Sequence, residues 1–251
     1  MHSVLATLAV ALLCACASAP PTPAPGRAAA FGTVRLVPRE GVTPAAPGSH
    51  SYGDREFEGV EFVDYSKPGF VVVYVDPQGA GGAAQRAGGE RSTSSLPRAR
   101  DRAALSIRSG ATHAIFDPPH AALGAGGEIT VANQSDATHV VSCPAGGLVK
   151  RLAPGESIAI AATTPGEWPV YLLDVAGEQA RIFAAPGPYR VVSSAGRFEL
   201  LDLEPGRAHL RAWHPRFPPA SAWVDLAPGK SQRVDLEVRV DQHDEGAPLA
   251  P

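Results

Sequence analysis

The sequence has only three Cys and eight His, and the spacing of these side chains limits the metal chemistry that they could support. Cys143 follows His139 by four residues in what reads as one strand, so their Cα atoms lie ~13 Å apart, too far to share one ion. Asp174 and Glu178 could add carboxylate oxygens to the His139 imidazole, a set of ligands that zinc accepts. Carboxylates in exposed loops are usually only solvated, so His139 is the one candidate metal ligand and we expect no bound metal.

The other reactive side chains are expected to be structural. Free Cys143 reads as a small buried apolar residue rather than a reactive thiol. His113 and His120 are expected at a surface or a sheet edge, and His214, beside Trp213, is expected to cap or hydrogen-bond a turn. The sequence has no G-x-S-x-G, H-E-x-x-H or P-loop motif, and we predict that the protein is not an enzyme.

Composition predicts an all-β protein. The chain has 26 Gly and 25 Pro, and many of them separate short apolar runs, which is typical of strands joined by turns. Net charge is −3, with Arg and acidic residues interspersed, so the sequence offers no basic patch for nucleic acid. Only Cys14, Cys16 and Cys143 are present, and processing at Cys16 would leave no pair for an internal disulfide.

The N-terminus predicts export. Residues 1–15 hold an apolar run too short to span a bilayer but suited to a signal peptide. The stretch Leu13-Cys14-Ala15-Cys16 resembles a bacterial lipoprotein lipobox, which implies lipid attachment at Cys16, and residues 16–30 then form the anchor and a Pro/Ala spacer. Ala17-Ser18-Ala19 offers a competing site for plain secretion. Ala17 is not the Asp that resembles an inner-membrane retention signal, so we predict the periplasmic face of the outer membrane.

The rest of the chain divides into strand-rich stretches and one low-complexity segment. Residues 78–103 contain almost no large apolar side chain and are predicted to be a flexible insertion. The last residues, 242–251, are predicted to be a frayed tail. Strands are predicted at 31–37 and 69–75, and then at 104–109, 111–118, 128–134, 138–143, 157–163, 168–174 and 180–185. Further strands are predicted at 189–194, 197–203, 208–214, 221–227 and 231–240, where RVDLEVRV alternates cleanly.

An ordered series of motifs resembles a bacterial periplasmic group that joins a cupredoxin-like domain to a carboxypeptidase-regulatory-like module. The motifs are GFVVVYV at 69–75, Phe116-Asp117-Pro118, the run from Gly126 to Asp136 with His139 behind it, Gly196 to Gly206, and Trp213-His214. The resemblance implies a cupredoxin-like Greek-key β-sandwich over 31–186. A smaller transthyretin-like or carboxypeptidase-regulatory-like β-sandwich would follow over 187–241.

The same resemblance implies that the copper ligands are largely lost. Anchored on Tyr171, the chain has Leu172 at the family's Cys place, Val175 at its second His place and Glu178 at its Met place. Type 1 copper needs a thiolate and two imidazoles, and Leu and Val offer no lone pair. We therefore predict a copper-free, non-catalytic envelope lipoprotein that binds a protein or a glycan. The alternative is a copper-binding or electron-transfer protein with an unorthodox site around His139.

Overall fold

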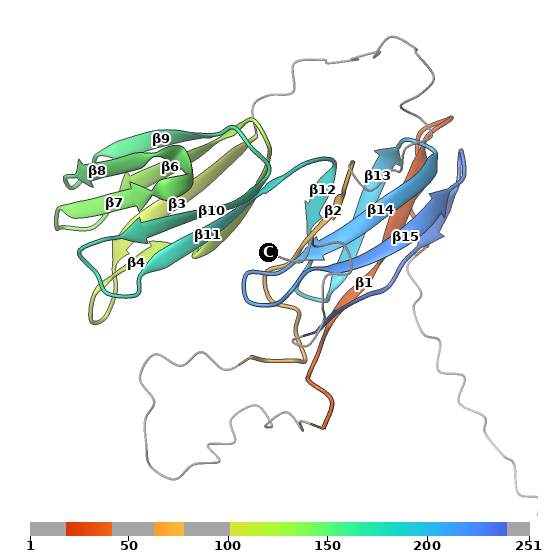
Figure 1. Cartoon of the computed structure of the whole chain (residues 1–251), viewed down its shortest axis with the longest axis horizontal. Helices are drawn as coiled ribbons and strands as arrows, with labels where there is room; N and C mark the ends of the chain where they lie inside the picture. Colours follow the sequence, from red (N-terminus) through yellow and green to blue (C-terminus); the bar gives the residue numbers. More distant parts are fainter. Residues whose placement is uncertain (1–18, 42–62, 78–100, 240–251) are drawn as a thin grey trace, which may run out of the picture.

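The computed structural model describes residues 19–41, 63–77 and 101–239, and within them the chain is all β apart from one short turn of 3-10 helix, η1 (Pro144–Gly146) (Figure 1). The predicted all-β class is thus confirmed. The signal peptide at 1–15, the lipid site at Cys16, the tail at 242–251 and most of the predicted insertion at 78–103 lie outside the described residues. A search of the described part of the chain for a helix long and apolar enough to cross a membrane found none.

The strands form two β-sandwiches, and the first is built from consecutive strands. They are β3 (Arg102–Ser109), β4 (Ala114–Asp117), β5 (His120–Gly124), β6 (Gly127–Asn133), β7 (His139–Cys143), β8 (Leu148–Leu152), β9 (Ser157–Ala162), β10 (Gly166–Leu172) and β11 (Gln179–Ala185). Five of them form a sheet in the order β5-β11-β10-β7-β8, and four form its partner in the order β4-β3-β6-β9. Since β3 begins at Arg102, the predicted insertion extended two residues too far.

Alternating burial explains these strands. In β6 every second residue is buried, including Ile129 and Val131, which have no exposed surface. Such a strand turns one face toward the opposite sheet, as a period of two requires. The apolar faces of the two sheets enclose one core, in which Trp168 of β10 is the largest fully buried side chain.

The second sandwich draws its strands from both ends of the described chain. They are β1 (Ala28–Val37), β2 (Val72–Val75), β12 (Tyr189–Val191), β13 (Arg197–Leu203), β14 (Gly206–Trp213), β15 (Ala220–Leu226), β16 (Ser231–Arg233) and β17 (Leu236–Arg239). One sheet has the order β13-β1-β16, with β17 also paired to β1, and the other has the order β12-β2-β14-β15. Their inner faces share a separate core.

This pairing corrects the predicted boundary of the first sandwich. The first sandwich was expected over 31–186, with the alternative that 31–68 form a separate element. In the structure β1 pairs with β13, β16 and β17, and β2 pairs with β12 and β14. Ala28–Ala30, expected in the spacer, are fully buried at the start of β1. The first sandwich is therefore an insertion between β2 and β12 of the second (Figure 1).

The strand that was predicted as continuous over 231–240 is broken at residues 234–235, and we call this break the bend. β1 pairs with β16 through Ala29–Phe31 and with β17 from Val34 onward, and Val234 lies between the two partners. At the crossing, a Cβ on Gly32 would lie 1.8 Å from the carbonyl oxygen of Val234, so only glycine fits. Asp235 then accepts hydrogen bonds from the Thr33 backbone N–H and hydroxyl, at 3.0 and 2.7 Å, which fixes the bend.

An aromatic cluster joins the two sandwiches, and we call it the seam. It consists of Val72, Tyr74, Phe183, Ala185 and Trp213, with Phe70, Ala122 and Tyr189 packed against it. The Phe183 and Trp213 rings stack with their centroids 4.9 Å apart, one from β11 and the other from β14. Since each sandwich contributes its outer sheet face, the seam leaves both inner cores intact.

Candidate functional site

The loop between β10 and β11 carries most of the predicted ligand positions, and its backbone ties it to neighbouring strands. The Leu172 N–H donates to the Glu178 carbonyl at 3.1 Å, which closes the loop on itself. The Leu173 N–H donates to the Val140 carbonyl at 2.9 Å, which ties the loop to β7. The loop is thus held beside His139, the first residue of β7.

Both ring nitrogens of His139 are hydrogen-bonded. The residue is 5% exposed, its Nδ1 lies 2.7 Å from Oδ2 of Asp174, and its Nε2 lies 3.0 Å from Oγ of Ser135. A carboxylate can only accept, so the Nδ1 proton points at Asp174. Each nitrogen thus has a polar side-chain partner, and the Ser135 hydroxyl also donates to Oδ1 of Asn133 at 2.7 Å.

Asp174 connects β7 to the loop through both of its oxygens. Oδ1 accepts the backbone N–H of Val140 at 2.8 Å, while Oδ2 accepts from His139. Burial alone would raise the pKa of Asp174, but these hydrogen bonds outweigh it and hold the pKa below its ordinary value. The carboxylate therefore stays charged and acts as a clamp between the two segments.

The turn before His139 is held by Asn133, which is 1% exposed. Its Nδ2 donates to the carbonyls of Ala137 and Leu152, at 2.8 and 2.9 Å, and its Oδ1 accepts the Ser135 backbone N–H at 3.0 Å. Asp136, from the same sequence motif, accepts from the Ser109 hydroxyl at 3.0 Å. The polar residues that led to His139 in the sequence thus position the turn.

The other predicted ligand positions offer no ligand to His139. Leu172 is 2% exposed in the core, and Val175 packs against that core. Glu178 accepts the Phe116 backbone N–H at 2.7 Å, and its other oxygen lies 4.0 Å from Nε2 of His113. Of the two carboxylates, only Asp174 is in contact with His139. Across the described ranges no group of three His, Cys, Asp or Glu side chains could hold a metal ion.

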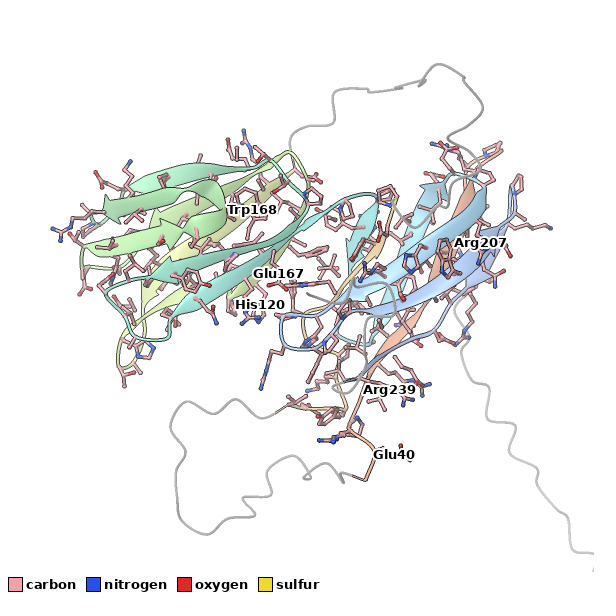
Figure 2. All side chains as sticks on the ribbon, viewed as in Figure 1. Glu40, His120, Glu167, Trp168, Arg207 and Arg239 are labelled. Carbon is pink, nitrogen blue, oxygen red and sulfur yellow. The ribbon has the colours of Figure 1, made fainter. Side chains whose placement is uncertain are left out.

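The other reactive side chains singled out in the sequence lie in the core, at the surface or in an edge strand. Cys143 has no exposed surface, and burial raises the pKa of its thiol, so its prediction as a small buried residue is confirmed. The His113 side chain is 51% exposed, as predicted for a surface residue. His120 lies in the edge strand β5, as predicted, on the side of the first sandwich that faces the second (Figure 2).

The predicted turn role of His214 is confirmed, but its place at the junction was not foreseen. Its Nδ1 accepts the Arg216 backbone N–H at 3.0 Å, and its ring stacks on Phe217 at 4.7 Å. Burial, followed by the charges of His120 and Arg216, lowers the pKa of His214 to about 4. The imidazole is therefore neutral in the folded protein at neutral pH.

Polar contacts across the seam were also missed by sequence reasoning. Nε1 of Trp213 donates to Oε1 of Glu167 at 2.8 Å, and the Arg181 guanidinium donates to the Pro215 carbonyl. Glu167 and Arg181 belong to β10 and β11, whereas Trp213 and Pro215 belong to the second sandwich. The Trp213-His214 motif lies at this junction, but the sequence alone did not indicate which residues of the first sandwich would contact it.

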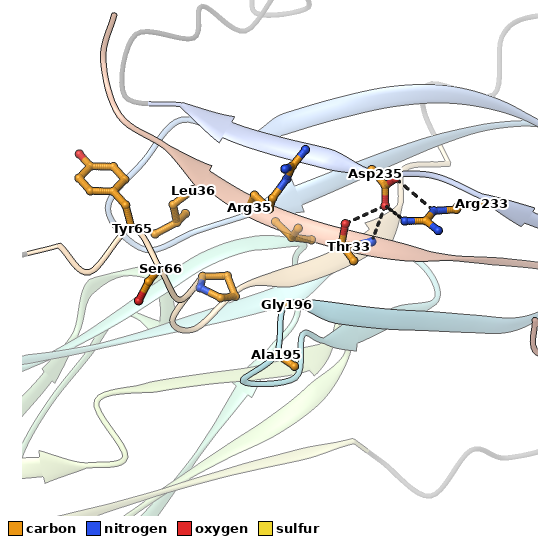
Figure 3. Close-up of a pocket in the computed structure, with 11 residues that line it drawn as sticks. Thr33, Arg35, Leu36, Tyr65, Ser66, Ala195, Gly196, Arg233 and Asp235 are labelled. Atoms are coloured by element: carbon orange, nitrogen blue, oxygen red, sulfur yellow. Dashed lines mark hydrogen bonds and ion pairs between the residues drawn. The ribbon is translucent and has the colours of Figure 1, made fainter. Parts of the chain in front are cut away.

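A pocket of about 430 Å³ lies between β1, residues 65–68, the turn before β13 and the bend at Asp235 (Figure 3). Its charged groups are already paired. Arg233 lies 3.2 Å from Asp235, and Arg35 lies 3.6 Å from Glu237. The pocket is polar and open, and the one hydroxyl–carboxylate contact printed between two of its lining residues joins Thr33 to Asp235 at 2.7 Å.

Comparison with known proteins shows distant structural similarity to cupredoxins over about a third of the chain. A purple cupredoxin from Nitrosopumilus maritimus matches 33% of this chain and 99% of its own, with 15% identity and a TM-score of 0.29. A copper-containing nitrite reductase from Thermus scotoductus matches 34% of this chain and 27% of its own, with 19% identity and a TM-score of 0.28. An amicyanin matches 32% of this chain and 81% of its own, with 12% identity and a TM-score of 0.28. No protein-family model matches the sequence, and no curated protein matches it either.

Proposed function

We propose that this chain is a non-catalytic binding or scaffold protein of the cell envelope, whose first sandwich is a cupredoxin-like domain without a copper site. One observation carries the copper-free part of the proposal. Both nitrogens of His139 are engaged, at 2.7 Å by Asp174 and at 3.0 Å by Ser135. His139 thus serves as a structural link between β7 and the loop.

The chemistry of the neighbouring positions supports this role. A type 1 copper site requires a thiolate, two imidazoles and a weak axial ligand. Leu172 is buried in the core, Val175 packs against it, and neither side chain has a lone pair. The only thiol in the described part of the chain, Cys143, points into the same core four residues after His139. These residues suit packing rather than metal binding.

The envelope location rests on the N-terminal sequence. Lipid attachment at Cys16 would anchor the mature protein, because two or three acyl chains contribute ~0.8 kcal/mol per buried methylene. We assign the anchored protein to the periplasmic face of the outer membrane, and the second sandwich to the carboxypeptidase-regulatory-like type. In such a protein, function would lie in surfaces that contact an envelope protein or a glycan.

Metal titration tests the copper-free proposal. Incubation with Cu(II) and desalting should leave far less than one ion per protein and no intense band near ~600 nm. A type 1 copper protein treated in the same way is the positive control. A blue band or stoichiometric copper in the wild type, lost in His139→Gln, would instead establish the alternative copper-binding protein.

The anchor is tested separately. Cys16→Ala should abolish labelling by radioactive fatty acid and move the protein to the soluble fraction or leave it unprocessed. A wild-type protein that fractionates as soluble and begins at Pro20 would show plain secretion instead.

A further inference from the structure

One tryptophan lies on the surface, although the other two are buried. Trp223 is 46% exposed, whereas Trp168 and Trp213 are 2% and 5% exposed. Trp223 belongs to β15, the last strand of the sheet β12-β2-β14-β15. It lies on the same outer sheet face as Trp213, because alternate residues of β14 and β15 share a face. This part of the face extends beyond the seam, and Arg207 marks it in Figure 2.

Two side chains of β14 contact the indole of Trp223. His209 is its register partner, and the two rings stack at 4.5 Å with an angle of 16° between their planes. The Arg207 guanidinium carbon lies 4.6 Å from the indole centroid. Both partners approach from the β14 side, and none of the described strands pairs with the other edge of β15 in this sheet. An exposure close to one half is what an indole with one covered face and one open face should have.

Charged groups of both signs lie on this face, near Trp223 and near its stacking partner His209. Asp225 is the register partner of Arg207, and both are exposed. Asp76 lies 3.4 Å from Arg211 and 3.9 Å from His209. Two arginines and two aspartates therefore balance, and the face offers donors and acceptors side by side. Hydroxyl groups, which both donate and accept, complement such a surface better than an ion does.

We propose that the open face of Trp223, with Arg207 and Asp225 beside it, binds a neutral glycan strand built from β-linked pyranoses. Equatorial substituents leave a flat C–H face on each such ring, and that face stacks on an aromatic side chain. Arg207 can donate to the ring hydroxyls and Asp225 can accept from them. The balanced charge disfavours polyanions, since their phosphates or carboxylates need a cationic surface.

The proposal names a ligand class for the binding role proposed above and so rests on that role. A single stacking residue with two polar neighbours supports only weak binding, with a Kd on the order of 1 mM. Anchored copies on one membrane would engage a polymer at several points, which raises the overall affinity without new contacts.

Tryptophan fluorescence of the full mature protein tests this site directly, because Trp223 is the chain's one exposed indole. Two soluble probes are suitable, a β-linked N-acetylglucosamine hexamer and cellohexaose. At least one should produce a saturable fluorescence change and protect the emission from acrylamide quenching. Trp223→Ala should remove the exposed signal, and binding measured by calorimetry should fall at least about tenfold.

Further variants separate stacking from hydrogen bonding and from folding. Trp223→Phe should retain part of the affinity, and Asp225→Ala should weaken binding while the fluorescence of the free protein stays the same. Val149→Ala, which alters another exposed apolar residue, 66% exposed on β8, should bind like the wild type. Circular dichroism checks that each variant is folded.

Several results would overturn the assignment. These are the absence of saturable binding by either hexamer, equal binding by Trp223→Ala, or binding confined to a carboxylated polymer such as polygalacturonate. A dimer that forms through the open edge of β15 and is lost in Trp223→Ala would assign this face to a second copy of the chain. Copper binding would refute the proposed copper-free function but would leave these glycan measurements interpretable. Failure of the proposed function can therefore be distinguished from failure of the glycan proposal.

Discussion

Acidification should destabilise this protein through His214. The side chain is 7% exposed, and protonation of Nδ1 would displace the hydrogen bond from the Arg216 N–H. Burial, with further contributions from the charges of His120 and Arg216, lowers the pKa from an ordinary value of 6.5 to about 4. Between about pH 4 and pH 6.5, His214 is therefore neutral in the folded protein but protonated in the unfolded chain.

The linkage between protonation and folding gives the sign and the size of the change in unfolding free energy with pH. Because the folded pKa lies below the unfolded pKa, the stabilisation is fully present above pH 6.5, declines as the pH falls, and is lost below about 4. A difference of about 2.5 pKa units corresponds to roughly 3 kcal/mol, of which about 2 kcal/mol is lost by pH ~5. That is a large share of a typical unfolding free energy of about 5–15 kcal/mol.

Urea unfolding at neutral pH and at pH ~5 measures this loss, with His214→Asn as the comparison. Asn keeps an acceptor for the Arg216 N–H but does not titrate. It also loses the stacking on Phe217, so the variant should be less stable at neutral pH. Between the two pH values it should lose about 2 kcal/mol less than the wild type. His120→Asn should keep most of the wild-type slope, because burial is the first cause of the shift.

Equal losses in wild type and His214→Asn would refute this reasoning and assign the pH dependence to other groups. A direct titration of the His214 ring by NMR with a midpoint near its ordinary value would refute it independently.

Three further substitutions and one labelling experiment probe the fold. Gly32→Ala should cost at least about 3 kcal/mol in urea unfolding, since its Cβ would meet the Val234 carbonyl at 1.8 Å. Gly26→Ala, with a φ of 75° but open space, should cost only about 1 kcal/mol, and equal costs would contradict the crossing at β1. Trp213→Ala removes the centre of the seam and should lower the unfolding free energy by about 3–5 kcal/mol, whereas an unchanged urea midpoint would show that the seam contributes little. In the mature protein Cys143 should react with a thiol reagent only once urea unfolds the chain, and fast native labelling would contradict its burial.

Strands with strong alternation were predictable, and edge strands were less so. β8 (Leu148–Leu152) was missed because Val149, Lys150 and Arg151 are all exposed at the end of its sheet. β5, also an edge strand, contains small side chains that carry little periodic signal. The split between β16 and β17 had no local signal, since the pattern of RVDLEVRV continues through a bend that β1 imposes from far away in the sequence.

The local sequence pattern does not specify which strands pair with one another. The apolar run at Val71–Val73 predicted a buried strand, which is confirmed, but nothing in the run specified which sandwich would bury it. At the candidate site, spacing led to His139 and suggested that Asp174 could approach it, as the 2.7 Å contact shows. Glu178 was considered beside Asp174, but a backbone N–H of β4 engages its carboxylate, and that neighbour depends on tertiary packing.

The insertion of one sandwich into the other fixes an order of events during synthesis. All strands of the first sandwich, β3 to β11, have left the ribosome while the second still lacks β12 to β17. The strand β1 must wait for β17, with residues 38–235 made in between, which at roughly 5–20 residues per second takes some tens of seconds. β1 has no sheet neighbour until β13 is made and is fully paired only when β17 follows, and a secreted chain would carry β1 incompletely paired during export. A holding chaperone that covers residues 28–37 until the C-terminus emerges would therefore govern the yield of folded protein.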